Sequence, residues 1–273
     1  MRRRAGRGKR RFFALAEAAL ILVFVVLAAV IASRLLAAQR IQQEERMAAE
    51  LHRSLAVRAT TTSSEKVADD AEPPEIQAEI RELMQQNEDA VGLLHFDEDR
   101  TLYVCQTTDN QYYMTHRFDR SEDPAGMIYM DYRNSLWPRS ANLILYGHNM
   151  RDGSRFGTLK RFEKTEHIEE YPIFQLAGRY ETVDYVPFAV FHTSVDTKEE
   201  SYYPYDQIDF AGESEFNRYI RDVKERSILD LPVDVTYGDR LLTLVTCHSG
   251  IERGRLVIVC REVKPEDGLS EGT

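Results

Sequence analysis

The residues best suited to chemistry lie near the carboxyl end, in residues 241–263, LLTLVTCHSGIERGRLVIVCREV. Two runs rich in Val, Ile, Leu and Thr, 241–246 and 255–263, flank a loop with two glycines, which predicts an antiparallel hairpin. The hairpin would set Cys247 near Arg255. A cation beside a thiol favours the thiolate, and a guanidinium can donate to an oxyanion, so the pair suits acyl transfer. The alternative is a small buried cysteine beside a solvated arginine, because free cysteines are common in cores.

A second stretch, residues 142–162, reads NLILYGHNMRDGSRFGTLKRF. Its apolar start, 142–146, predicts a strand that runs directly into Gly-His-Asn, so His148 is expected on a loop at a strand end, where side chains reach functional sites. Residues 156–162 are expected to form a short helix. A lone histidine in a loop is usually only solvated. His148 therefore indicates a catalytic role only when it is considered together with a nucleophile.

Three cysteines, Cys105, Cys247 and Cys260, cannot all pair within one chain, so at least one thiol stays free. Cys105 and Cys260 lie in strand-like runs and are expected in the core. His248 is a rival base on paper, but successive side chains of an extended segment point to opposite faces. A zinc site built from Cys247, His248 and Cys260 lacks recognisable ligand spacing. No cluster implies a required metal or cofactor.

The net charge of −10 is unevenly distributed. Residues 1–11 carry seven basic residues and no acid, so residues 12–273 carry a net charge of −17. An acidic body argues against a nucleic-acid partner, which would call for a clustered basic surface.

Residues 12–32 are apolar except for Glu17, and 21 helical residues span about 31 Å, one hydrocarbon thickness. We expect a transmembrane signal anchor whose basic leader, 1–11, is cytoplasmic and whose remaining chain is extracellular. The membrane is therefore an expected partner. A cleaved signal peptide is the alternative, and both interpretations export the domain.

A helical stalk and a polar linker are expected over residues 33–71, with the linker proper at 59–70, ATTTSSEKVADD. A catalytic domain would follow over 72–264, and a short tail over 265–273.

The domain reads as mainly β with a few helices. Strand-like runs occupy 91–96, 102–106, 127–131, 142–146 and 182–193, and amphipathic helices are expected over 75–87 and 213–226. Many short strands with few helices predict a barrel or a sandwich.

Taken together, YGHNMRDGSRFGTLKRF, TLVTC and RLVIV resemble the class B sortases, with further similarity in DNQYYMTH and AGMIYMDYRN. The resemblance covers residues 74–264. It implies a sortase-like closed β-barrel with N-terminal helices and a helix before the nucleophile strand. It also implies a membrane enzyme of Gram-positive bacteria that anchors proteins to the cell wall.

The resemblance further implies that Cys247 is the nucleophile, His148 the acid and base, and Arg255 the oxyanion-stabilising arginine. The segment between Cys247 and Arg255 is short for the family, which keeps Arg253 open as an alternative. The neighbouring residues expected to bind substrate are Thr246, Asn149 and Ser249.

The expected reaction is transpeptidation. Cys247 would cleave a C-terminal sorting motif of a secreted protein after Thr, form a thioester, and pass the acyl group to a peptidoglycan amine. Two alternatives keep the fold, a pilin polymerase that uses a lysine amine and a purely hydrolytic cysteine peptidase. A third is a non-catalytic, membrane-tethered binding module with a structural cysteine.

Overall fold

The computed structural model describes residues 5–56, 72–97, 100–248 and 253–269, without the side chains of residues 5–16, 54–56 and 248. The chain forms two compact units, Met1–Glu44 and Glu45–Thr273. The expected linker at 59–70 and Ser249 lie outside the described residues. The boundaries at residues 11, 32, 71 and 264 stay predictions.

The first unit is formed by helix α1, whose residues from Glu45 onward belong to the second unit. Helix α1 runs from Ala5 to Ala56, and its segment Glu17–Arg53 contains a window long and apolar enough to cross a membrane, with exposed apolar side chains. A signal sequence near the N-terminus would satisfy the same criteria of length and composition. The helix fits the expected transmembrane segment.

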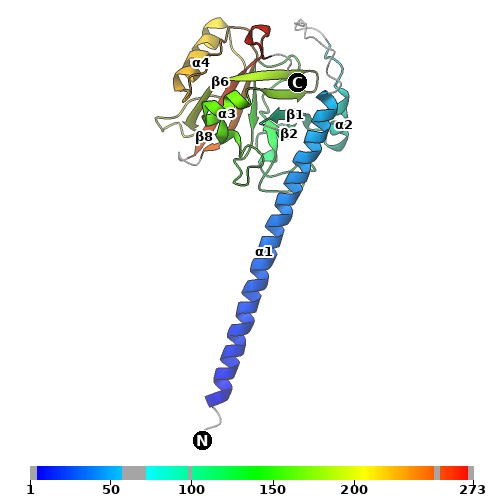
Figure 1. Ribbon diagram of the computed structural model, residues 1–273, viewed down its shortest axis with the longest axis vertical. Coiled ribbons are helices and arrows are strands. Elements are labelled where there is room, and N and C mark those ends of the chain that lie inside the picture. Colours follow the sequence, from blue (N-terminus) through cyan, green and yellow to red (C-terminus); the bar gives the residue numbers. More distant parts are fainter. Residues whose placement is uncertain (1–4, 57–71, 98–99, 249–252, 270–273) are drawn as a thin grey trace. The chain divides into compact units, whose positions relative to one another are not determined.

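The second unit is built on a closed β-barrel, which confirms the mainly β prediction (Figure 1). Its strand order is β1-β2-β3-β4-β7-β8-β6-β5. The strands are β1 (Ala90–Phe96), β2 (Arg100–Cys105), β3 (Ile128–Met130), β4 (Asn142–Tyr146), β5 (Phe174–Gly178), β6 (Thr182–Ser194), β7 (Leu241–His248) and β8 (Gly254–Glu262). Strands β2 and β3 pair in parallel, as do β4 and β7, and the other neighbours are antiparallel.

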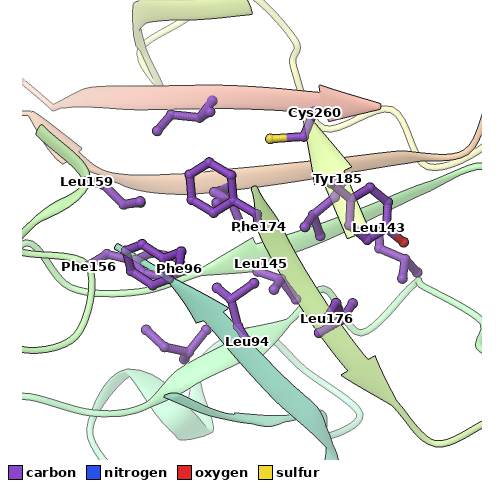
Figure 2. Close-up of a cluster of buried hydrophobic side chains, with 14 of the residues drawn as sticks. Leu94, Phe96, Leu143, Leu145, Phe156, Leu159, Phe174, Leu176, Tyr185 and Cys260 are labelled. Atoms are coloured by element: carbon purple, nitrogen blue, oxygen red, sulfur yellow. The ribbon is translucent and has the colours of Figure 1, made fainter. Parts of the chain in front are cut away.

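Alternating side chains of these strands fill the barrel, as period-2 patterning requires. Figure 2 shows part of this core, in which Phe96, Phe156 and Phe174 meet below Cys260. Phe96 lies 5.5 Å from Phe174 and 6.2 Å from Phe156, measured between ring centroids. Cys260 is fully buried there, as the sequence predicts.

Six helices or helical turns precede, connect or follow the strands of the barrel unit. They are α2 (Ala78–Gln86), η1 (Tyr112–Met114), η2 (Leu159–Glu163), α3 (Thr165–Glu170), α4 (Glu213–Arg226) and η3 (Pro265–Asp267), all among the described residues. The boundaries of α4 agree with the prediction, and α2 begins three residues later than predicted.

The short helix predicted over 156–162 is present as the 3-10 helix η2, which begins three residues later than predicted, after a turn over 156–158. Phe156, Leu159 and Phe162 are all fully buried in the barrel core. Leu159 and Phe162 both lie within η2, and their three-residue spacing matches the three residues per turn of a 3-10 helix, which keeps these two side chains on one face.

Helix α4 covers an outer face of the barrel beside β6 (Figure 1). Its buried stripe of Phe216, Ile220 and Val223 belongs to a hydrophobic cluster that also contains Val245 of β7 and Val257 of β8. The outward-pointing side chains of the two central strands are therefore partly covered, and the ends of these strands carry the polar residues described next.

Candidate active site

Cys247 and Arg255 are direct partners across the antiparallel β7–β8 pair. Leu242 and Leu244 of β7 point into the barrel core, so alternation sends Cys247 to the outer face, where its side chain is exposed. Directly opposite residues project to the same face with Cβ atoms about 4.5–5.5 Å apart. The hairpin predicted from the sequence therefore sets the thiol beside a guanidinium.

His148 reaches the same place from a different strand. Strand β4 runs parallel to β7, with Tyr146 beside Val245, so the two strands end side by side. Gly147 continues this pairing, donating its N–H to the Val245 carbonyl at 3.1 Å. The imidazole of His148 then hydrogen-bonds to Cys247, and its Nε2 lies 2.8 Å from the carbonyl oxygen of Met114.

The contacts favour an ion pair of thiolate and imidazolium. The hydrogen bond with His148 is the largest cause that lowers the pKa of Cys247; burial opposes it and the charge of Arg255 adds to it. The same hydrogen bond raises the pKa of His148, burial opposes it, and the Met114 carbonyl raises it further. A thiolate is the nucleophilic form of cysteine, so this site has the electronic requirement for attack on a carbonyl.

The pKa values of the other two cysteines are raised, whereas that of Cys247 is lowered. Burial raises the pKa of Cys105 to about 12 and raises that of Cys260 well above its ordinary value. Cys260 pairs with Leu242 on β7, five residues from Cys247, a separation of about 17 Å along a strand. The zinc site considered for Cys247 and Cys260 is therefore ruled out by the register.

Arg255 is better placed than Arg253 to act on the thiolate. Arg253 lies in the turn before β8, is largely exposed, and has Asp196 as its ionic neighbour at 3.9 Å. Arg255 lies opposite Cys247 and contributes to its lowered pKa. The Arg255 guanidinium donates to the carbonyl of Gly254 at 3.0 Å.

The residues expected to bind substrate have different surroundings. Thr246 is 2% exposed, and its hydroxyl donates to the Gly147 carbonyl at 2.8 Å, which favours a positioning role over substrate contact. Asn149 is partly exposed and donates its side-chain amide to the Cys247 carbonyl at 2.9 Å. Ser249 and the side chain of His248 lie outside the described residues.

A buried carboxylate, Asp131, has no role in the sequence prediction. It accepts hydrogen bonds from Arg133, from the Asn110 amide at 3.1 Å and from the Tyr146 hydroxyl at 3.0 Å. Burial raises the pKa of Asp131, but the hydrogen bonds of Arg133 and Asn110 outweigh it and lower the pKa overall. Asp131 thus joins the segment before Met114 to the strand before His148.

Two tyrosines, Tyr129 and Tyr205, lie near Arg255. Tyr129 of β3 stacks on Tyr146 with ring centroids 5.4 Å apart, and both point outward from the barrel. Burial raises the pKa values of Tyr129 and Tyr205 to about 12, and the charge of Arg255 partly opposes both shifts. These phenols therefore stay protonated at neutral pH, and they lie close to the guanidinium.

Within the described part of the chain, no group of three or more His, Cys, Asp or Glu side chains could hold a metal ion. A thiolate, a protonated imidazole and a fixed guanidinium are together suited to acyl transfer.

Comparisons with known sequences match much of the barrel unit to one family. Residues 97–263 match the family profile described as Sortase domain. Sortase B of Listeria monocytogenes is 33% identical over 187 residues, covering 67% of this chain and 74% of that protein. Sortase B of Staphylococcus aureus is 28% identical over 192 residues, covering 69% of this chain and 76% of that protein.

Solved structures show the same fold. A Bacillus anthracis structure described as similar to sortase B is 29% identical, with a TM-score of 0.66, and the match covers 82% of this chain and 95% of that one. Sortase B of B. anthracis in complex with AAEK1 is 31% identical, with a TM-score of 0.62, over 71% of this chain and 88% of that one. The chain therefore belongs to the sortase family, in its class B of cysteine transpeptidases.

Proposed function

We propose that this chain is a membrane-anchored sortase in which Cys247 is the nucleophile, His148 the acid and base, and Arg255 the oxyanion-stabilising group. Its substrate is a secreted protein with a C-terminal sorting motif, cleaved after Thr, and its acceptor is a cell-wall amine. The observation that supports it most is the interaction of the Cys247 thiol with His148, together with the position of Cys247 directly opposite Arg255 on the neighbouring strand.

The first half-reaction forms a thioester. The Cys247 thiolate attacks the threonine carbonyl carbon, and the Arg255 guanidinium donates to the resulting oxyanion. When the tetrahedral intermediate collapses, the C–N bond breaks and the His148 imidazolium gives its proton to the departing amine. The substrate is left as an acyl group on sulfur.

The second half-reaction transfers this acyl group. Neutral His148 removes a proton from the incoming amine as its nitrogen attacks the thioester carbon. The C–S bond breaks, the thiolate is restored, and the imidazolium is ready for another cycle. A sortase B structure has been solved with triglycine, and one of S. aureus sortase B with substrate, which supports an amine acceptor and a peptide donor.

Membrane anchoring is supported by helix α1 and by the basic residues before its apolar segment. The bias of Lys and Arg toward one end predicts a cytoplasmic N-terminus and an extracellular catalytic unit. An enzyme held there would meet both an exported substrate and the cell wall.

The test is a peptide library scanned around threonine, incubated with the protein with and without candidate amines. We expect ligated product with a glycine-type or stem-peptide amine, activity in a Cys260→Ala control, and none in Cys247→Ala. Hydrolysed product alone would indicate a peptidase, and ligation only to a lysine side chain would indicate pilin polymerisation. An active Cys247→Ala variant would overturn the proposal.

A further inference from the structure

Glu45, near the end of α1, bridges two parts of the barrel unit. One carboxylate oxygen accepts the backbone N–H of Arg155 at 3.1 Å, and the other accepts from the Arg100 guanidinium at 3.1 Å. The Glu45 side chain is 18% exposed and that of Arg100 21%. This contact joins residues 110 positions apart in the chain, from α1 to the loop after β4.

Arg155 closes the loop that begins at His148. Asn149 and Arg155 form an isolated β-bridge, and the next residue, Phe156, donates its N–H to the His148 carbonyl at 3.0 Å. Arg155 has a φ of +53°, a left-handed conformation that is costly for a residue with a side chain. A carboxylate on its N–H therefore stabilises the strained end of the histidine loop.

The charge of Arg155 also reaches the active site. Its side chain is buried, and its positive charge is one of the causes that lower the pKa of His148. Burial raises the pKa of Glu45, and Arg100 and Arg155 oppose this shift by attracting the carboxylate. The negative charge of ionised Glu45 therefore offsets part of the positive charge of Arg155, which otherwise disfavours protonation of His148.

We infer that Glu45 is a positioning residue for His148, acting through Arg155 by fixing the end of the histidine loop and by balancing its charge. The inference rests on the proposed function only in giving His148 the acid and base role. The carboxyl-terminal part of α1 then helps to position the imidazolium that pairs with the Cys247 thiolate.

The test compares Glu45→Gln with Glu50→Gln in the full chain held in detergent micelles. Glu50 is exposed on the same helix, so its variant makes the same change of charge away from the loop. Glutamine keeps the size of Glu45 and an acceptor for the Arg155 N–H. The variant should therefore fold, and any change can be assigned to the lost charge. A Glu45→Ala variant, which also removes the acceptor, should show the larger effect.

The first readout is the pH dependence of Cys247 alkylation by iodoacetamide, followed by intact mass, since the other two thiols are buried. Loss of the Glu45 charge should lower the pKa of His148, so the midpoint of Cys247 alkylation should move to higher pH. The second readout is turnover of a threonine peptide. We expect kcat to fall about 2-fold to 30-fold with KM nearly unchanged.

Glu50→Gln should match the wild type in both measurements. An alkylation profile of Glu45→Gln that coincides with that of Glu50→Gln would overturn the inference. Alkylation requires no acyl transfer, so a shifted midpoint in a protein without transpeptidase activity would refute the proposed function and leave this inference standing.

Discussion

The carbonyl oxygen of Met114 lies 2.8 Å from Nε2 of His148. A carbonyl can only accept, so Nε2 carries a proton, and Nδ1 is left as the nitrogen that meets the thiol of Cys247. In the imidazolium both N–H groups then have acceptors, the Met114 carbonyl and the thiolate. A backbone atom 34 residues away thus orients the histidine.

The turn that carries Met114 should matter for the rate. Asp109 caps this turn, accepting the N–H groups of Gln111 at 2.6 Å and Tyr112 at 2.9 Å. We expect Asp109→Ala to lower kcat by up to about 100-fold, because a displacement of about 1 Å can cost that much, with little change in KM. Asp119→Ala, which removes a similar cap on Ser121, is the control, and equal losses in both variants would contradict this role.

The two arginines near the β7–β8 turn should differ in effect. If Arg255 donates to the oxyanion, Arg255→Gln should lower kcat by about 100-fold to 1,000-fold, the cost of losing one such donor. Arg253→Gln removes the neighbouring charge in the turn and should change kcat by less than about threefold. The reverse order in steady-state kinetics would transfer the role to Arg253.

The pH profile of kcat/KM should be bell-shaped. Activity requires the thiolate and the imidazolium together, so it rises as Cys247 loses its proton and falls as His148 loses its own. The lowered pKa of Cys247 moves the acid limb to lower pH, and the raised pKa of His148 moves the alkaline limb to higher pH. A profile without an alkaline limb would exclude His148 as the acid.

His52 should make the barrel unit sensitive to acid. Its ring stacks on His95 at 4.2 Å between centroids, and burial, followed by the charge of His95, lowers its pKa from 6.5 to about 4, against the opposing attraction of Asp184. Unfolding therefore takes up a proton between these pH values. The stability that depends on neutral His52 is fully present above pH 6.5 and is lost as the pH falls toward 4.

The measurement is thermal unfolding of the wild type and of His52→Phe at pH 7 and pH 4.5. Phenylalanine keeps a ring against His95 but does not titrate, so the melting temperature of the variant should fall less on acidification. Parallel losses in the two proteins would assign the acid sensitivity to other groups.

The central hairpin of the site could be predicted because local patterns determine it. Alternation along residues 241–246 and the two glycines that follow set Cys247 against Arg255, and the register confirms that pairing. His148 was predictable as a strand-end residue, but its partner was not. Met114 acts through its backbone carbonyl, which every residue type carries, so no residue letter signals the contact.

Other features depend on contacts between distant segments. Strand β5, FQLAG, is short and contains Ala and Gly, which have low strand propensity, so only its pairing with β1 and β6 makes it a strand. Asp131 reads as an ordinary acid in a turn until the fold brings Asn110 and Tyr146 to it. The contact of Glu45 with Arg155 follows no periodicity in the sequence.

The most direct measurement is the intact mass of the protein after incubation with a threonine-containing sorting peptide. The account predicts an added mass equal to the acyl fragment, located on Cys247 by peptide mapping, and its discharge into a ligated product when amine is supplied. His148→Ala should lower the rate of adduct formation by about 100-fold to 10,000-fold. An adduct of the same mass in Cys247→Ala, or one located on Cys105 or Cys260 in the wild type, would contradict it.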